Sequence, residues 1–252
     1  MDPPKTIPAE LVNEYTMNGE IPVFNWYFND VGGIATLDWT NEYLQAFIES
    51  FSINNILNQK EGHKPYPNCA YYFLYAFTKY IHYIRNKNLA IIGSTHPWIE
   101  AILVNLGVKS VTTVEYNVPV CNHPIIKTTS YENFCKSSTK YDAIISYSSI
   151  EHSGLGRYGD PLNPRGDIEA MSEIYNALIP GGLCFLGIPI GKDSIVWNAH
   201  RIYGAKRLHL VLDKFKESEW IAHDKNVIYS NIDAAETANG CTQPIIVLEK
   251  SA

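Results

Sequence analysis

"LAIIGSTHPWIEAILVNLGVKSVTTVEYN", residues 89–117, is the stretch that decides the fold. Its first apolar run ends at Gly93, and after a short turn Pro97 is a favourable first residue for a helix. Apolar residues then repeat at helical spacing until a glycine stops the helix. A second β-branched run, residues 111–114, ends in the acid Glu115. The stretch therefore predicts a strand–helix–strand unit of the kind that binds nucleotides.

Strands and helices alternate along the chain from residue 88 onward, which is typical of a doubly wound parallel sheet. We expect a Rossmann-like, mostly parallel sheet of seven strands with an antiparallel last strand. Residues 1–87 are expected to form an N-terminal helical and aromatic cap, and residues 88–252 one compact core. The expected strands are 89–93, 111–115, 124–127, 141–146, 182–188, 218–224 and 243–249, and the expected helices of the core are 97–106, 167–179 and 204–216.

Composition limits the classes of function. The 252 residues are 46% hydrophobic and 18% charged, which indicates an ordinary folded protein. A net charge of −6 argues against a nucleic-acid partner, which needs a positive surface. No apolar run reaches the roughly 18–20 residues that cross a bilayer. Five scattered cysteines and the absence of an apolar signal core favour a cytoplasmic protein, with the secretory lumen as the alternative if an N-terminal anchor has been removed.

The turn after the first strand of this core lacks the glycines of a dinucleotide site. Residues 93–98 read Gly-Ser-Thr-His-Pro-Trp where such a site has Gly-x-Gly-x-x-Gly. A pyrophosphate needs close backbone approach, whereas S-adenosylmethionine carries no phosphate and can be held by one glycine and some hydroxyls. Glu115, placed 22 residues after Gly93, is well positioned to accept both hydroxyl hydrogens of a ribose. These features favour S-adenosyl-L-methionine over a nicotinamide cofactor.

Residues 88–249 resemble the class I S-adenosylmethionine-dependent methyltransferase superfamily, through "YDAIISYSSIEH" and "ALIPGGLCFLGIP". More narrowly, "GSTHPWIEA", "VEYN", "EHSGLGRYGDPLNPRGD" and "NAHRIYG" resemble a nematode-type methyltransferase-like family known as a domain of unknown function. The resemblance implies that residues 129–134 lie near the adenine and that residues 146–147 close the cofactor pocket. The expected cofactor-binding residues are Gly93, Ser94, Thr95, Glu115, Tyr116, Glu132, Asn133, Ser146 and Tyr147.

Methyl transfer to a hydroxyl needs alignment and a base. His152 is the first candidate for the base, because imidazole titrates near neutral pH, and His200 is the second. The loop 153–167 is long for a compact domain, which suggests a lid on the acceptor side. We expect O-methylation of a small polar molecule or a glycan, with oligomeric state open. The expected acceptor-binding residues are Glu151, Arg157, Tyr158 and Arg201.

Other readings stay open. Some quinone-type methyltransferases hold a divalent cation with Glu-x-x-Glu-His, but Ser148 occupies the first position here, so no metal site is expected. A nicotinamide oxidoreductase should have a Tyr-x-x-x-Lys pair, and Tyr203 to Lys206 is one residue too short. A degenerate nucleoside-binding or scaffold protein without catalysis is the non-enzymatic alternative, favoured by the altered first turn.

Overall fold

The structure is a computed structural model that describes residues 2–30, 38–62, 66–230 and 241–251. Its contacts form two compact units. Unit 1 comprises Met1–Ala35, Tyr147–Asn176 and Leu186–Leu248, and unit 2 comprises Thr36–Ser146, Ala177–Phe185 and Glu249–Ala252. This grouping does not follow the expected boundary after residue 87, because the N-terminal segment groups with later residues.

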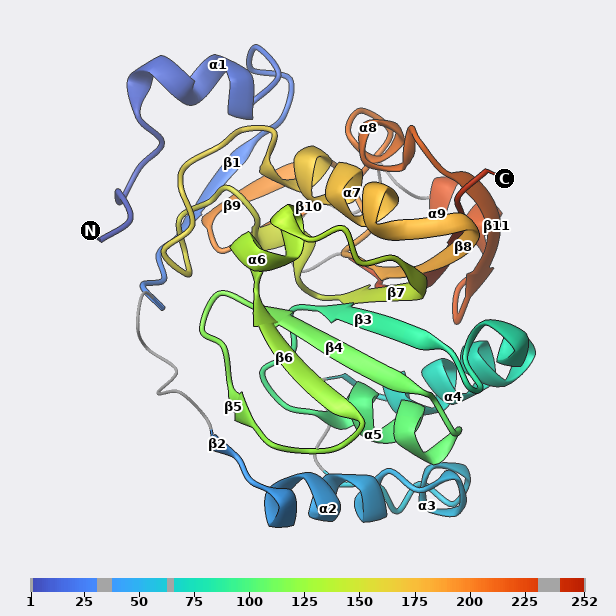
Figure 1. Cartoon of the computed structure of the whole chain (residues 1–252). Helices are drawn as coiled ribbons and strands as arrows, with labels where there is room; N and C mark the ends of the chain where they lie inside the picture. Colours follow the sequence, from blue (N-terminus) through green and yellow to red (C-terminus); the bar gives the residue numbers. More distant parts are fainter. Residues whose placement is uncertain (1, 31–37, 63–65, 231–240, 252) are drawn as a thin grey trace. The chain divides into compact units, whose positions relative to one another are not determined.

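Unit 2 contains the strand–helix–strand stretch, whose elements β3, α5 and β4 are drawn in shades of green in Figure 1. Strand β3 (Asn88–Ile92) pairs in parallel with β4 (Ser110–Glu115), and helix α5 (Trp98–Asn105) connects them. β4 pairs in parallel with β6 (Ile126–Ser130), and β3 pairs in parallel with β7 (Tyr141–Tyr147). Parallel neighbours joined by a helix are what the alternating pattern predicted.

The large sheet has the strand order β11–β12–β8–β7–β3–β4–β6. Chain order runs outward from β3 through β4 to β6 and then resumes at β7 on the other side of β3, so strand order reverses between β3 and β7. Ligands bind at such a switch point in open α/β sheets. The prediction of a seven-stranded, mostly parallel Rossmann-like sheet with one antiparallel end is confirmed. The remaining strands are β8 (Leu178–Gly187), β11 (Lys216–Ile221) and β12 (Ile245–Glu249).

Helices α4 (Cys69–Lys79) and α5 lie on the same side of β3 and β4, as Figure 1 shows. Trp98 of α5 packs against Phe73 of α4 and against Phe51, which caps α2 (Asn41–Ser50). Several α5 side chains are fully buried, and each buried Ile or Leu contributes roughly 1.5–3 kcal/mol of transfer free energy. Helix α2 follows Thr40, whose hydroxyl accepts a hydrogen bond from the Tyr43 amide.

Unit 1 contains a smaller sheet that the sequence did not predict. β1 (Val23–Trp26) pairs in parallel with β9 (Ser194–Asn198), which pairs antiparallel with β10 (His200–Ile202). Trp197 of β9 is fully buried and its ring meets the ring of Tyr15 edge-on. The aromatic segment near residue 24 is therefore a strand rather than part of a helical cap.

The other two expected core helices are both present, and one of them is shorter than expected. The expected helix 204–216 is reduced to α8 (Leu208–Leu212), and the expected helix 167–179 is α7 (Gly166–Ala177). No helix in the described part of the chain has both the length and the apolar character needed to span a membrane. The other elements are η1 (Ala9–Leu11), α1 (Val12–Tyr15), β2 (Asp38–Trp39), α3 (Ile53–Leu57), η2 (Ile81–Tyr83), β5 (Val120–Cys121), α6 (Tyr131–Lys136), η3 (Ile150–His152) and α9 (Lys225–Ser230).

Candidate functional site

The turn after β3 is joined to the end of β4. Gly93 has φ +78°, a left-handed conformation that favours glycine, and its amide donates to the carbonyl of Val114 (3.0 Å). This bend places the Ser94 amide so that it donates to the Glu115 carboxylate. The prediction that the turn and Glu115 lie together is therefore confirmed, whereas their role in binding a ribose stays a prediction.

Glu115 is the last residue of β4, and its second carboxylate oxygen accepts a hydrogen bond from the Tyr116 amide (3.3 Å). Burial raises the pKa of Glu115, while the hydrogen bonds from the Ser94 and Tyr116 amides oppose that rise. Each carboxylate oxygen can accept more than one hydrogen bond, so both retain capacity for ligand hydroxyls. In the sheet, Glu115 is the register partner of Ser130, which places the start of α6 beside it.

The start of α6 carries the residues expected near an adenine. The Ser130 hydroxyl caps this helix by accepting a hydrogen bond from the Asn133 amide (3.1 Å). Glu132 is exposed and forms an i,i+4 ion pair with Lys136. Tyr116 and Tyr131 approach with ring centroids 5.5 Å apart. The surface ion pair engages Glu132, and the contact of Glu132 or Asn133 with an adenine stays a prediction.

Ser146 lies at the end of β7, opposite Ile92 of β3 in the register. Its side chain is fully buried, and among the described residues its Oγ has no hydrogen-bond partner. An unsatisfied buried hydroxyl is costly, so its persistence at the switch point suits a polar ligand. Thr95, by contrast, is exposed, and its hydroxyl lies 3.1 Å from Nδ1 of His96.

Sequence reasoning missed Glu100. This residue lies in α5 with its side chain fully buried, and burial raises its pKa to about 7. The hydroxyls of Thr113 (2.6 Å) and Ser94 (3.1 Å) contact its two oxygens. The available signal was a single acid in the otherwise apolar run Trp98–Leu103, all of which is buried.

In unit 1, Tyr147 ends β7 and is buried. A Cβ placed on Gly187 would lie 2.0 Å from the Tyr147 ring, so the strand β8 accepts only glycine at this position without a shift. The Ser148 amide donates to the carbonyl of Gly187 (2.9 Å), which fixes the start of the segment leading to η3.

His152 follows in η3 and is held at one ring nitrogen. Its Nδ1 lies 2.5 Å from the carbonyl of Ala199, and a neutral imidazole in this place donates from Nδ1 and leaves Nε2 as the acceptor. Burial lowers the pKa of His152 to about 3, despite the opposing effect of that hydrogen bond. The rings of Tyr158 (5.7 Å) and His200 (6.3 Å) stand edge-on to it. His152 is therefore a neutral but weak base, not one tuned to neutral pH.

Glu151 is the second buried carboxyl. Its side chain is 1% exposed, and Oε1 lies 3.8 Å from Nε2 of His152. Among the described residues its Oε2 has no hydrogen-bond partner, and burial raises its pKa to about 7. Glu151 and His152 are thus two neighbouring buried titratable groups.

The Arg157 side chain contacts other residues of unit 1. Its Nε donates to the Asp30 carboxylate (2.7 Å), and its guanidinium lies over the rings of Phe28 (4.5 Å) and Tyr158 (5.0 Å). The side chain remains 19% exposed, so part of the guanidinium edge faces solvent. This is compatible with the expected contact to a polar acceptor.

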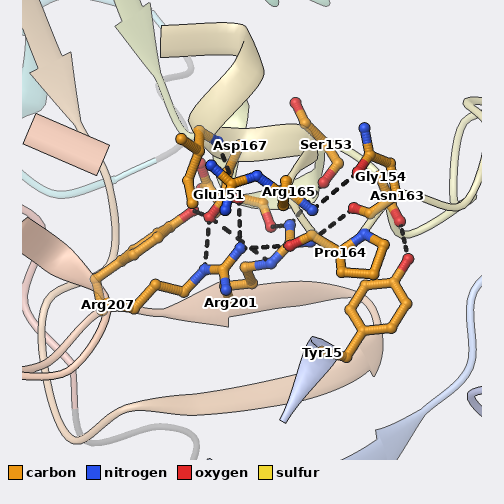
Figure 2. Close-up of polar contacts among 12 residues, drawn as sticks. Tyr15, Glu151, Ser153, Gly154, Asn163, Pro164, Arg165, Asp167, Arg201 and Arg207 are labelled. Atoms are coloured by element: carbon orange, nitrogen blue, oxygen red, sulfur yellow. Dashed lines mark hydrogen bonds and ion pairs between the residues drawn. The ribbon is translucent and has the colours of Figure 1, made fainter. Parts of the chain in front are cut away.

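Arg201 lies in a different environment from the one expected. It is fully buried, and Figure 2 shows its guanidinium among the backbone carbonyls of the 151–166 segment. It donates to the carbonyls of Ser153 (2.6 Å), Glu151 (3.4 Å) and Asn163 (3.4 Å), and its Nε lies 3.7 Å from Asp167. A buried guanidinium committed to these partners holds the loop, so the expected acceptor contact of Arg201 has no exposed group to make it.

The loop 153–166 is pinned at several points besides Arg201. Asp160 accepts hydrogen bonds from the amides of Gly154 (2.7 Å) and Gly156 (3.1 Å). The Tyr15 hydroxyl donates to the Gly154 carbonyl, and Arg207 binds both oxygens of Asp167 (2.6 and 2.8 Å; Figure 2). These contacts tie the loop to the rest of unit 1, and its role on the acceptor side stays a prediction.

The family described as "Caenorhabditis protein of unknown function, DUF268" matches residues 86–250, more than half of the chain. The chain belongs to this family. The matched region of this DUF268 protein contains the turn at Gly93, Glu115, and the two stretches that meet around Arg201. No curated protein matches the chain.

Solved structures show that the DUF268 fold is shared more widely. The [4+2]-cyclase SpnF superposes with a TM-score of 0.52 at 11% identity, covering 83% of this chain and 94% of SpnF. N-methyltransferase NodS from Bradyrhizobium japonicum WM9 gives a TM-score of 0.46 at 12% identity, covering 74% of this chain and all of NodS. The S-adenosyl-l-homocysteine complex of NodS gives 0.48 at 11% identity, covering 84% and 100%. At these identities the likeness concerns the fold alone.

Metal ligands do not gather in the described part of this DUF268 protein: no group of three or more His, Cys, Asp or Glu side chains is arranged to hold an ion.

Proposed function

We propose that this DUF268 protein is an S-adenosyl-L-methionine-dependent methyltransferase. The observation that carries the proposal is the hydrogen bond from the Ser94 amide to Glu115, because it puts an acid next to the turn at the reversal point of the sheet. An acid at the end of the second strand is the group that accepts ribose hydroxyls in nucleoside sites. Coarser support comes from the shared Rossmann-like fold.

The residues of unit 2 fit the cofactor in their chemistry. When bound, S-adenosyl-L-methionine would supply a methyl carbon activated by a positive sulfur. Glu115 would accept the ribose hydroxyls, and the turn formed by Gly93, Ser94 and Thr95 would lie near the methionine end. The orphan hydroxyl of Ser146 supports the fit, because a polar ligand would satisfy it. Tyr116 and Asn133 would flank the adenine.

We propose His152 as the group that takes the acceptor's proton, with His200 as the second candidate. Its low pKa keeps the imidazole neutral and able to accept. A weak base suffices for a hydroxyl acceptor, because the protonated ether formed by methylation is far more acidic than an imidazolium. The Glu151 carboxyl, 3.8 Å from Nε2, would stabilise the imidazolium that results.

The acceptor that these groups favour is a small polar molecule or a glycan hydroxyl. Tyr158 and the partly exposed side chain of Arg157 offer hydrogen bonds to such a group. The net charge of −6 disfavours nucleic acid as the substrate.

A binding or scaffold protein without methyl transfer is the second candidate. The turn at Gly93 lacks the second glycine, and Thr95 and His96 bring side chains into it where glycines would leave room. SpnF, which shares the fold, is by its name a cyclase, so the fold alone does not select the reaction.

Two experiments in sequence test the proposal. Calorimetric titration with S-adenosylmethionine, S-adenosylhomocysteine and NAD separates the classes: we expect the first two to bind and NAD not to bind. Binding of NAD alone would select an oxidoreductase, and no binding would select the scaffold. If the methyl donor binds, a labelled-methyl screen across glycans, phenols, small amines and peptides identifies the acceptor, and labelling of amines alone would contradict O-methylation.

A further inference from the structure

The acid Glu100 lies buried directly beneath the turn that carries Ser94, and both residues belong to unit 2. Oε1 of Glu100 lies 2.6 Å from the hydroxyl of Thr113 in β4, and Oε2 lies 3.1 Å from the hydroxyl of Ser94. The side chains of Glu100 and Thr113 are both fully buried. Helices α2 and α4 pack against α5, the helix that carries Glu100.

The Ser94 hydroxyl has two acceptors within reach. Its Oγ lies 3.1 Å from Glu100 and also 3.1 Å from the carbonyl of His96. A hydroxyl carries one hydrogen, so an ionised Glu100 and the His96 carbonyl would compete for it. If Glu100 carries a proton, the conflict disappears: Thr113 donates to Glu100, Glu100 donates to Ser94, and Ser94 donates to the His96 carbonyl.

The electrostatic environment of Glu100 also favours its protonated form. Burial raises the pKa of Glu100 to about 7, against the opposing hydrogen bonds of Thr113 and Ser94. The charged group that acts on it is Glu115 at the end of β4, and like charge raises the pKa further. Towards α2 and α4, the neighbouring Trp98 of α5 meets the uncharged rings of Phe51 and Phe73.

We propose that Glu100 is a neutral carboxylic acid that donates a hydrogen bond to Ser94 Oγ and thereby holds the Ser94 amide on Glu115. Glu100 is thus a positioning residue: it fixes a turn that has one glycine where related sites have several, and through the turn it orients the acid expected to bind the ribose. The effect on nucleoside binding rests on the proposed function, whereas the hold on the turn does not.

Two variants separate a neutral acid from a carboxylate. In Glu100→Gln the amide oxygen accepts from Thr113 and the amide nitrogen donates to Ser94, which reproduces the proposed pattern. In Glu100→Met the length of the side chain is kept and both hydrogen bonds are lost. Glu42→Gln, an exposed acid of α2, is the matched control. The readouts are the ¹⁵N–¹H signal of the Ser94 amide and the calorimetric affinity for S-adenosylhomocysteine.

We expect Glu100→Gln to leave the Ser94 amide signal in place and the affinity within about threefold, as in the control. Glu100→Met should move the signal and weaken binding about tenfold or more, as loss of supporting hydrogen bonds does. An unmoved Ser94 signal in Glu100→Met overturns the proposal, and so does a Glu100→Gln protein that behaves like Glu100→Met. If the wild-type chain binds no S-adenosylhomocysteine but the amide responds as expected, the proposed function fails and the inference about the turn stands.

Infrared spectroscopy of the wild-type protein gives a second test that does not depend on a folded Glu100→Met variant. Subtracting the spectrum of Glu100→Gln from that of the wild type should leave the carbonyl stretch of a protonated carboxylic acid at pH 6. The band should fade as the pH rises through about 7. A difference spectrum that shows a carboxylate at pH 6 contradicts the neutral acid and overturns the proposal.

Discussion

The backbone amide of Ser94 donates a hydrogen bond to the side-chain carboxylate of Glu115, across 21 residues of chain. The two residues come from the ends of adjacent parallel strands, and the left-handed conformation of Gly93 turns the amide toward the acid. This contact joins the two elements on which nucleoside binding is proposed to depend. It also makes the position of Glu115 sensitive to anything that changes the turn.

Replacing Glu115 should weaken nucleoside binding without unfolding the protein. Glu115→Gln keeps one acceptor oxygen but places an amide NH2 beside a donor, so we expect the affinity for S-adenosylhomocysteine to fall about tenfold or more. The measurement is calorimetric titration, with Glu42→Gln as the control. Affinity unchanged within error in Glu115→Gln would remove the ribose-binding role.

Replacing Arg201 should lower the stability of unit 1. Arg201→Met leaves three carbonyls without their donor and weakens the compensation of buried Asp167, and breaking a buried charge cluster typically costs about 3–5 kcal/mol. Urea unfolding measures the loss. Arg165 is exposed and lies in the loop 153–166 that Arg201 contacts, so Arg165→Met is the control. It should change the unfolding free energy by less than about 0.5 kcal/mol. Equal losses of unfolding free energy in the two variants would show that the buried contacts of Arg201 do not stabilise unit 1.

His152 should make the protein sensitive to acid. Its pKa is about 3 in the folded protein and 6.5 as the ordinary value, so the unfolded chain takes up a proton that the folded protein refuses. This stabilising contribution is present above pH 6.5 and is lost as the pH falls toward 3, by about 2 kcal/mol between pH 6.5 and 4.5. The raised pKa values of Glu100 and Glu151 act oppositely, because their contributions are lost as the pH rises through 7.

His152→Asn isolates the histidine, because Asn can still donate to the Ala199 carbonyl while the two carboxyls remain. We expect its unfolding free energy, followed by urea titration at each pH, to fall less between pH 6.5 and 4.5 than that of the wild type. His82→Asn, at an exposed position, should keep the wild-type slope. Parallel curves for wild type and His152→Asn would mean that His152 is not buried in its neutral form.

His152→Asn should also lower turnover with the acceptor that the screen identifies. Loss of a general base typically costs about 10²–10⁴-fold in rate, and the cofactor affinity should stay within about twofold because that site is in unit 2. Comparing kcat with the dissociation constant of S-adenosylhomocysteine separates the two effects. A variant with normal kcat would point to His200 or to no base at all.

The sequence predicted the secondary structure well where its apolar periodicity was strong. The elements from β3 to β4 were predicted to within about one residue, because apolar runs, Pro97 and Gly107 mark their ends. The contact of Ser94 with Glu115 followed from the rule that parallel strands end at the same edge of a sheet. The burial of Glu100 against this turn, however, depends on which side chains from other helices cover it, and a single sequence does not show this.

The missed features are those in which a residue lies in an environment unusual for its type. The four residues of β1 are all exposed, so they show no alternation of polar and apolar positions. Glu100 and Arg201 are charged residue types that are fully buried, whereas such residues are almost always at the surface. The carbonyls that compensate Arg201 lie 38 to 50 residues away in the chain, which explains why Arg201 was expected to contact an acceptor instead.

A crystal structure with S-adenosylhomocysteine bound tests the central claim most directly. We expect the ribose hydroxyls to lie within hydrogen-bond distance of the Glu115 carboxylate, with the amino-acid end near the turn formed by Gly93 and Ser94. A nucleoside bound elsewhere, or a crystal soaked at saturating ligand with nothing beside Glu115, would contradict it.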